Sequence, residues 1–201
     1  MVNEFIEMFW SLDGLAFVTG LAFIVLMIKQ NIWCWPIGII SSLVFVFIMF
    51  ESKLYMESVL YVFYVFVGIY GWVTWSNKKV ELKIKKIGLK FHSMALGFGI
   101  AMALGLGLLF DRYTDAERPI ADNLSTIFSF IASYMEAHKF LSSWIYWIVI
   151  NLFSIWLYHD RDKKLLAGLM VIYFLLSVAG YLQWKKDMDK DKNQTLTPEL
   201  A

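Results

Sequence analysis

Residues 144–151 read Trp-Ile-Tyr-Trp-Ile-Val-Ile-Asn, and they place two indole rings and one amide at helical spacing. Trp144, Trp147 and Asn151 are spaced i, i+3, i+7, so they share one face of a helix. Aliphatic side chains fill the other faces, which is typical of a helix in lipid. Two interpretations stay open: a face that binds a flat, partly polar solute, or interfacial tryptophans with an asparagine that joins two helices.

The composition is that of a polytopic membrane protein. Of the 201 residues, 59% are hydrophobic, 18% are aromatic and 17% are charged, and the net charge is +1. Such a chain is neither a soluble domain nor a nucleic-acid-binding protein. The single cysteine, Cys34, excludes an intrachain disulfide. No catalytic triad, phosphate loop, zinc pattern or dinucleotide fingerprint is present, so we expect no enzymatic activity and no cofactor.

Seven stretches are apolar and long enough to cross a membrane, which takes roughly 20 residues for a helix. The chain is therefore predicted to be all-α with seven transmembrane helices. The predicted stretches are 10–28, 33–50, 57–76, 91–110, 120–137, 143–159 and 164–184.

An internal repeat appears when the chain is shifted by 109 residues and compared with itself. Matches of Trp, Tyr, Gly and Asp in one ungapped register are improbable by chance in a membrane protein. The matched pairs are Asp13 and Asp122, Trp35 and Trp144, Tyr64 and Tyr173, Gly71 and Gly180, and Trp75 and Trp184. This pattern predicts two parallel three-helix repeats joined by a connector helix, a 3+1+3 plan that occurs in transporters.

The repeat divides the chain into four parts: a first repeat at 1–78, a basic linker and connector helix at 79–112, a second repeat at 113–186, and a polar tail at 187–201 that we expect to be disordered. Glycines at 97, 99, 105 and 107 make the connector slim enough to pack closely. Twelve of the 18 Lys and Arg residues fall on the side of the C-terminus and six on the side of the N-terminus. This bias predicts an outer N-terminus and a cytoplasmic C-terminus.

A polar stripe runs along residues 120–137 at spacings of 3, 4, 4 and 3. Its members are Asp122, Ser125, Ser129, Ser133 and Glu136. Lipid offers these groups no partners, so the stripe is predicted to face protein or a wet cavity. Asp122, Ser129, Ser133 and Glu136 are candidate ligand contacts, and hydrogen bonds between helices are the alternative for the serines. The first repeat has no such stripe, since Glu136 corresponds to Met27.

Aromatic residues add further candidates. Tyr64 and Tyr173 lie deep in their predicted helices, where each hydroxyl needs a partner, and Trp35 matches Trp144. Trp75 and Trp184, at the ends of their helices, are predicted to anchor the chain at the membrane interface rather than to bind ligand. No arginine falls inside a predicted span, which argues against a phosphorylated solute.

Four motifs together resemble the PnuC-type nicotinamide riboside transporters of bacterial inner membranes, over residues 12 to 186. They are Trp-x-x-Trp-x-x-x-Asn at 144–151, Trp-Pro-x-Gly at 35–38, Tyr-Gly-Trp-x-x-Trp at 70–75 and Gly-Tyr-x-x-Trp at 180–184. The resemblance implies a 3+1+3 fold like that of the SWEET sugar carriers and an oligomer, expected to be a homotrimer in the lipid of an inner membrane. It also implies uptake of nicotinamide riboside by facilitated diffusion, followed by trapping by a cytoplasmic riboside kinase.

By the same resemblance, Trp144, Trp147 and Asn151 would hold the nicotinamide end, and the polar stripe would contact hydroxyl groups. We expect alternating access, with the two repeats rocking about the site. Two other functions stay open: a SWEET-like sugar carrier, and a membrane protein that binds its ligand but transports nothing.

Overall fold

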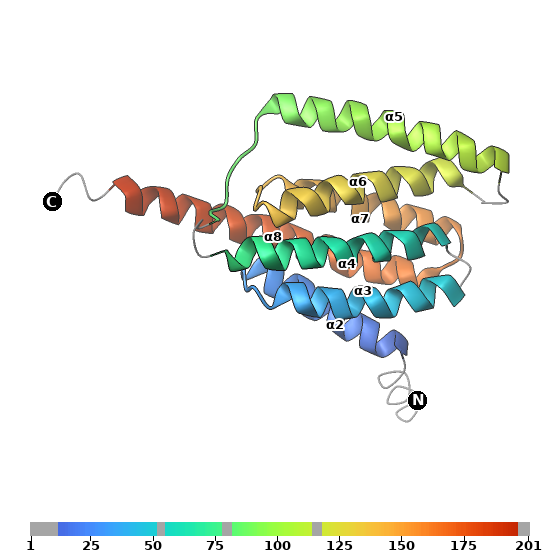
Figure 1. The fold of residues 1–201 in the computed structure, drawn as a ribbon, viewed down its shortest axis with the longest axis horizontal. Coiled ribbons are helices and arrows are strands. Elements are labelled where there is room, and N and C mark those ends of the chain that lie inside the picture. Colours follow the sequence, from blue (N-terminus) through green and yellow to red (C-terminus); the bar gives the residue numbers. More distant parts are fainter. Residues whose placement is uncertain (1–11, 52–54, 78–81, 114–117, 197–201) are drawn as a thin grey trace. The chain divides into compact units, whose positions relative to one another are not determined.

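The computed structural model describes residues 12–51, 55–77, 82–113 and 118–196 (Figure 1). Within these ranges the chain forms seven helices. They are α2 (Leu12–Ile28), α3 (Cys34–Glu51), α4 (Tyr55–Ser76), α5 (Leu89–Tyr113), α6 (Pro119–Ala137), α7 (Ser143–Asp160) and α8 (Lys164–Leu196). Each of the seven predicted stretches corresponds to one of these helices, so the all-α prediction is confirmed.

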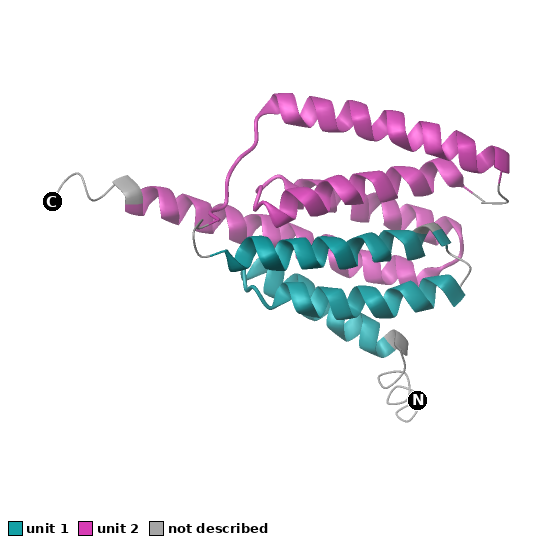
Figure 2. Cartoon of the chain, in the orientation of Figure 1, with its two compact units in different colours: residues 1–81 teal, residues 82–201 magenta. Residues whose placement is uncertain are grey.

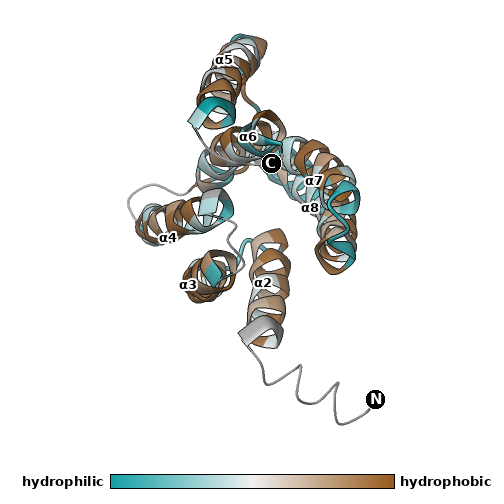
Figure 3. Ribbon diagram, turned by 90° about the vertical axis from the view of Figure 1, so that its right-hand side faces the viewer, coloured by the Kyte–Doolittle hydropathy of each residue, from teal (hydrophilic) through white to brown (hydrophobic). Residues whose placement is uncertain are grey.

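Four of the helices are long and apolar enough to cross a membrane: α3, α4 from Glu57, α5, and α8 up to Gln194. The described apolar part of α2 is shorter, from Gly14 to Ile28. Brown, the colour of hydrophobic residues in Figure 3, predominates on α3 and on α5 apart from one teal end of α5. The helices α6 and α7 carry amides, hydroxyls and acids that lower their hydropathy, and these are the helices that hold most of the predicted site residues.

The predicted disorder of the tail at 187–201 is wrong for its described part. α8 continues without a break through Leu196, well past the apolar segment that ends near Trp184. Gln183 donates a hydrogen bond to Asp187 one turn later (2.9 Å), and Met188 is buried. This i, i+4 pair and the burial of Met188 stabilise a helical segment that its charged composition alone does not favour. Residues 197–201 lie outside the described part.

The chain divides into two compact units, residues 1–81 and 82–201 (Figure 2). In the first unit α3 packs against both α2 and α4. In the second unit α5 packs against α6, α6 against α7, and α7 against α8. The connector helix α5, predicted as a separate part at 79–112, thus belongs with the second repeat.

The two units repeat each other in one turn, which lies between α2 and α3 in the first unit and between α6 and α7 in the second. Gln30 (φ 52°) and Lys139 (φ 54°), 109 residues apart, both adopt the left-handed conformation. In both units the residue after this position donates its N–H to a carbonyl five residues back, Asn31 to Leu26 and Phe140 to Met135, each at 2.9 Å. Two non-glycine residues in a rare backbone conformation at matched positions support the predicted duplication.

A tryptophan, a glycine and a second tryptophan form the same cluster in each unit. Trp35 packs edge-on against Trp75 (ring centroids 5.3 Å apart, 90°), and Trp144 packs edge-on against Trp184 (5.4 Å, 86°). The matched residues Gly71 and Gly180 lie against the rings of Trp35 and Trp144, because a Cβ there would come within 2.4 Å and 2.5 Å of ring carbons. Trp184 is fully buried, so its predicted role as an interfacial anchor is wrong.

Gly180→Ala is expected to lower the free energy of unfolding by about 1–3 kcal/mol, because the new methyl group overlaps the Trp144 ring. The ring cannot withdraw easily while Trp184 packs against it. Gly168→Ala on the same helix is the matched control: no atom lies within 4 Å of the place that its methyl group would take, so the better helix propensity of alanine should leave stability unchanged or raised. Thermal unfolding in detergent measures both, and equal midpoints for the two variants would contradict the packing described.

The small residues of α5 serve the predicted close packing. Ala95, Gly99, Ala103 and Gly107 are buried at intervals of four residues. A Cβ on Gly99 would meet the ring of Phe128 at 2.8 Å, and one on Gly107 would meet the backbone of Ile120 at 2.7 Å. The connector is therefore slim on the face that contacts α6, while Gly97 and Gly105 face open space.

Candidate functional site

Polar side chains are buried mainly in the second unit. Its buried polar and charged residues are Asn123, Thr126, Ser129, Ser133, Glu136, Ser143, Asn151, Ser154 and Ser177. The first unit buries only three among its described residues, Ser41, Ser42 and Ser58. The asymmetry expected from the sequence is thus present in the structure. The polar stripe of α6 faces protein, because lipid would leave these groups without partners.

Hydrogen bonds between helices account for part of the stripe. The hydroxyls of Ser125 on α6 and Ser154 on α7 lie 3.3 Å apart. Ser133 donates to the backbone carbonyl of Ser129 in its own helix (2.8 Å), and both serines are buried. The stripe therefore holds α6 against α7 at Ser125, while Ser129 and Ser133 form a short polar segment closer to Glu136.

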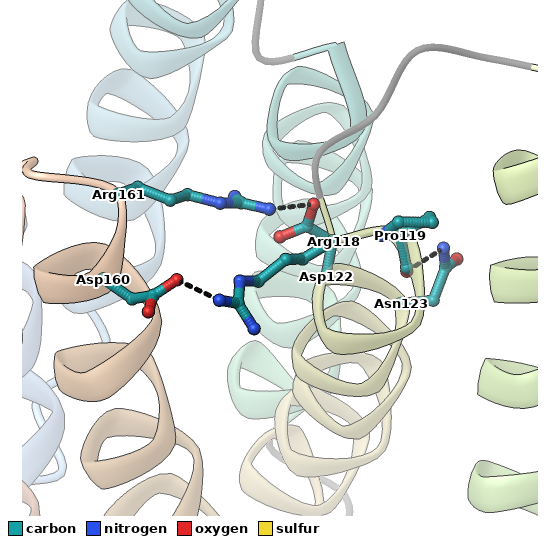
Figure 4. Close-up of polar contacts among 6 residues, drawn as sticks. All are labelled: Arg118, Pro119, Asp122, Asn123, Asp160 and Arg161. Carbon is teal, nitrogen blue, oxygen red and sulfur yellow. Dashed lines mark hydrogen bonds and ion pairs between the residues drawn. The ribbon is translucent and has the colours of Figure 1, made fainter.

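Two ion pairs join the start of α6 to the end of α7 (Figure 4). Arg161 contacts Asp122 at 2.7 Å with side chains only 7% and 12% exposed, and Arg118 contacts Asp160 at 2.7 Å with 45% and 33% exposed. An acid in the first turn of α6 and a base at the end of α7 also complement the helix dipoles. Asp122, a candidate ligand contact, is thus paired with a buried arginine that lies just beyond the last residue of α7.

The three residues of the Trp-x-x-Trp-x-x-x-Asn motif on α7 have different partners. Trp144 is 0% exposed and enclosed by Trp184 and Gly180 of α8, and its indole N–H has no partner among the described residues. The half-buried Trp147 donates its indole N–H to the carboxyl group of Glu136 on α6. Of the two rings, Trp147 is the one with exposed surface.

Asn151 links α7 to α8. Its amide nitrogen Nδ2 donates to the hydroxyl of Ser177 (3.1 Å), which in turn donates to the carbonyl oxygen of Tyr173 (2.7 Å). The alternative in which Asn151 joins two helices is therefore present in the structure. Ser177 fixes the amide orientation, and the sequence signal for it was its i+4 spacing from Tyr173 on one face of α8.

The remaining candidates differ in their surroundings. Tyr173 on α8 is half-buried, one turn from Ser177. Tyr64 on α4, also half-buried, packs edge-on against Tyr61 (5.6 Å). Trp35 is buried in the first unit as Trp144 is in the second. Trp147, Glu136, Asn151 and Tyr173 thus lie on three helices of one unit. The sequence alone did not indicate Ser154, which contacts Ser125, or Arg161, which contacts Asp122.

A family model described as nicotinamide mononucleotide transporter matches residues 11–186. The chain belongs to this family. Its members are membrane transporters, so the chain is a multi-pass membrane transporter and not an enzyme. The prediction of a membrane transporter is confirmed.

Relatives in the family are named for different vitamins. The nicotinamide riboside transporter PnuC of Escherichia coli K12 is 24% identical over 201 aligned residues, which cover 86% of this chain and 84% of the relative. The PnuC protein of Neisseria mucosa is also 24% identical (91% and 75% covered). The riboflavin/roseoflavin transporter RibM of Streptomyces davaonensis is 24% identical as well (93% and 90% covered).

The fold is that of a solved transporter. The crystal structure of the vitamin B3 transporter PnuC superposes with a TM-score of 0.78, at 24% identity, over 94% of this chain and 86% of that one. The nicotinamide mononucleotide transporter family thus supplies the architecture, while the names of its members leave three solutes to distinguish: a mononucleotide, a riboside and a flavin. The choice among these three solutes therefore depends on the chemistry of the residues in the second unit.

Proposed function

We propose that the chain carries nicotinamide riboside across the membrane by facilitated diffusion, through alternating access. The observation that carries the proposal is the arrangement on α7, where Trp147 with its acidic partner Glu136 lies one turn from Asn151. Nicotinamide riboside has a flat cationic ring, a carboxamide and a ribose. An indole face attracts a cation by roughly 0.5–2 kcal/mol, and an amide side chain matches a carboxamide.

The candidate residues of the second unit have different proposed roles. Trp147 stacks on the pyridinium ring, and Asn151, oriented by Ser177, binds the carboxamide with its carbonyl oxygen. Ser129, Ser133 and Tyr173 provide hydroxyl groups for the ribose. Trp144 supports Asn151 and Trp147 from the core, and Asp122 acts through its pairing with Arg161. Tyr64 and Trp35 remain candidates from the first unit.

The same arrangement disfavours the other two solutes. A phosphate group entering the membrane part would need a cation to replace its hydration. The buried guanidinium of Arg161 is already neutralised by Asp122, so the mononucleotide finds no free charge there. A flavin ring is uncharged, so it gains no cation–π attraction from the ring of Trp147. Nicotinamide riboside is therefore favoured over both.

Calorimetric titration of the detergent-purified protein tests the substrate directly. We expect saturable binding of nicotinamide riboside at micromolar or lower concentration, and none of nicotinamide mononucleotide, riboflavin or glucose. Binding of riboflavin alone would assign the chain to the flavin transporters of the family, and binding of glucose alone would favour a sugar carrier. Saturable binding of riboside without flux in liposomes would indicate a binding protein that does not transport.

Trp147→Ala is expected to weaken riboside binding by roughly 1–3 kcal/mol, the loss of one stacking partner. Trp156→Ala on the same helix is a matched control, because that ring is 48% exposed and packs on Phe153, and it should leave the affinity unchanged. Titration of both variants gives the measurement. Wild-type affinity in Trp147→Ala would remove this ring from the site.

We extend the proposal to the cellular setting. The excess of Lys and Arg on the C-terminal side favours a periplasmic N-terminus and a cytoplasmic C-terminus in a bacterial inner membrane. The protein is proposed to form a homotrimer in lipid and to deliver riboside to a cytoplasmic kinase that traps it by phosphorylation. Chemical crosslinking in native membranes tests the trimer, and a reporter fused to the C-terminus tests the orientation.

A further inference from the structure

Glu136 is a buried acid with no cationic partner among the described residues. Its side chain is 4% exposed, near the end of α6, and its one described polar partner is the indole N–H of Trp147. The other buried acid of the same helix, Asp122, has the guanidinium of Arg161 at 2.7 Å. Acids inside a membrane protein are almost always paired, and an unpaired one marks a functional site.

The first unit shows that the fold does not need an acid at this position. Met27, the counterpart of Glu136, is 0% exposed and precedes the same left-handed turn. The backbone carbonyls of both residues accept the same turn hydrogen bond, from Gln30 at 2.9 Å and from Lys139 at 3.0 Å. An apolar side chain therefore fits this place in the three-helix unit, and the carboxyl group serves something other than folding.

The partner Trp147 also belongs to the second unit alone. Its counterpart Gly38 lies against the ring of Phe23, because a Cβ on Gly38 would come within 2.6 Å of that ring. The counterpart of Phe23 is the buried Ala132. The bulky ring thus lies on α2 in the first unit and on α7 in the second, where the indole N–H of Trp147 reaches Glu136. At these two positions the second unit therefore has an aromatic face and an acid where the first unit has neither. Such a pair suits a flat cation.

We infer that Glu136 provides the counter-charge for the cationic ring of the ligand, and so makes the transporter select positively charged pyridines over neutral ones. The inference rests on the proposed function and says which feature of the substrate Glu136 recognises, the positive charge of its ring. A bound pyridinium supplies the positive charge that the protein does not offer Glu136 among its described residues. The hydrogen bond from Trp147 positions the carboxyl group and the indole ring toward the same ligand.

The test compares nicotinamide riboside with its reduced form, in which the ring is neutral while the carboxamide and ribose are kept. Titration of the wild-type protein is expected to show at least about tenfold tighter binding of the cationic form. Glu136→Gln retains an acceptor for the Trp147 indole but removes the charge, and should reduce this preference to about twofold or less. Glu136→Met reproduces the first unit and should weaken both ligands, because Trp147 loses its partner.

Thermal unfolding of each variant establishes that it is folded. Equal wild-type affinity for the two ring forms would overturn the inference even if no variant could be purified. An unchanged preference in Glu136→Gln would overturn it as well. If the wild-type protein binds neither form, the proposed function fails, and the inference fails with it; binding of both forms with equal affinity contradicts the inference alone.

Discussion

Arg161→Met is expected to lower the free energy of unfolding by about 3–5 kcal/mol, because it leaves the carboxylate of Asp122 buried without its cation. The methionine keeps the apolar stem of the side chain and lacks the guanidinium, so the loss of charge is the main change. Thermal or denaturant unfolding in detergent measures the effect. The double variant Asp122→Asn/Arg161→Met should recover most of the stability, because no unpaired charge remains.

The neighbouring ion pair is a control within the same helix ends. Arg118 and Asp160 are at the same distance, 2.7 Å, but their side chains are 45% and 33% exposed. An exposed pair contributes about 0–1 kcal/mol, so Arg118→Met should have a small effect. Equal losses for Arg118→Met and Arg161→Met would show that burial does not distinguish the two pairs and would contradict the geometry of Figure 4.

Trp144→Ala is expected to lower the free energy of unfolding by roughly 2–4 kcal/mol, because it opens a cavity between Gly180 and Trp184. We place the value below that of soluble proteins because lipid solvates an apolar side chain in the unfolded state as well. Trp35→Ala should cost a similar amount, since it removes the matching ring from the first unit. Unfolding measurements on both variants give the comparison.

The outcome of Trp144→Ala separates packing from ligand contact. If Trp144 mainly supports the core, the ratio of riboside affinity lost to stability lost should be smaller for Trp144→Ala than for Trp147→Ala. A variant of Trp144 with wild-type stability and no binding would reverse this assignment. It would place the fully buried ring in the site and require a second conformation in which the ring is accessible.

Much of the fold follows from periodic properties of the sequence. Apolar length predicts the helices, and the matched Trp35 and Trp144 reveal the duplication. The extension of α8 was not predicted, because it depends on local pairs such as Gln183 with Asp187 and on the burial of Met188, neither of which raises hydropathy. The role of Trp184 was misjudged because a tryptophan at a helix end looks the same in sequence whether it faces lipid headgroups or another ring.

For the candidate site residues, the sequence indicates which residues share a helix face but not which residues they contact. Spacing could not show that Trp147 reaches Glu136 or that Asn151 reaches Ser177. Arg161 was missed because it follows the apolar stretch of α7, while its long side chain lies buried against Asp122. Sequence spacing fixes the face of a helix, whereas the partner depends on how two helices pack.

Uptake of labelled nicotinamide riboside into liposomes that contain only this protein tests the central claim most directly. We predict saturable uptake that stops when the inner and outer concentrations are equal, with or without an imposed pH step. Excess unlabelled riboside should compete, and nicotinamide mononucleotide should not. No flux above that of empty liposomes, or accumulation driven by the pH step, would contradict a facilitated carrier of nicotinamide riboside.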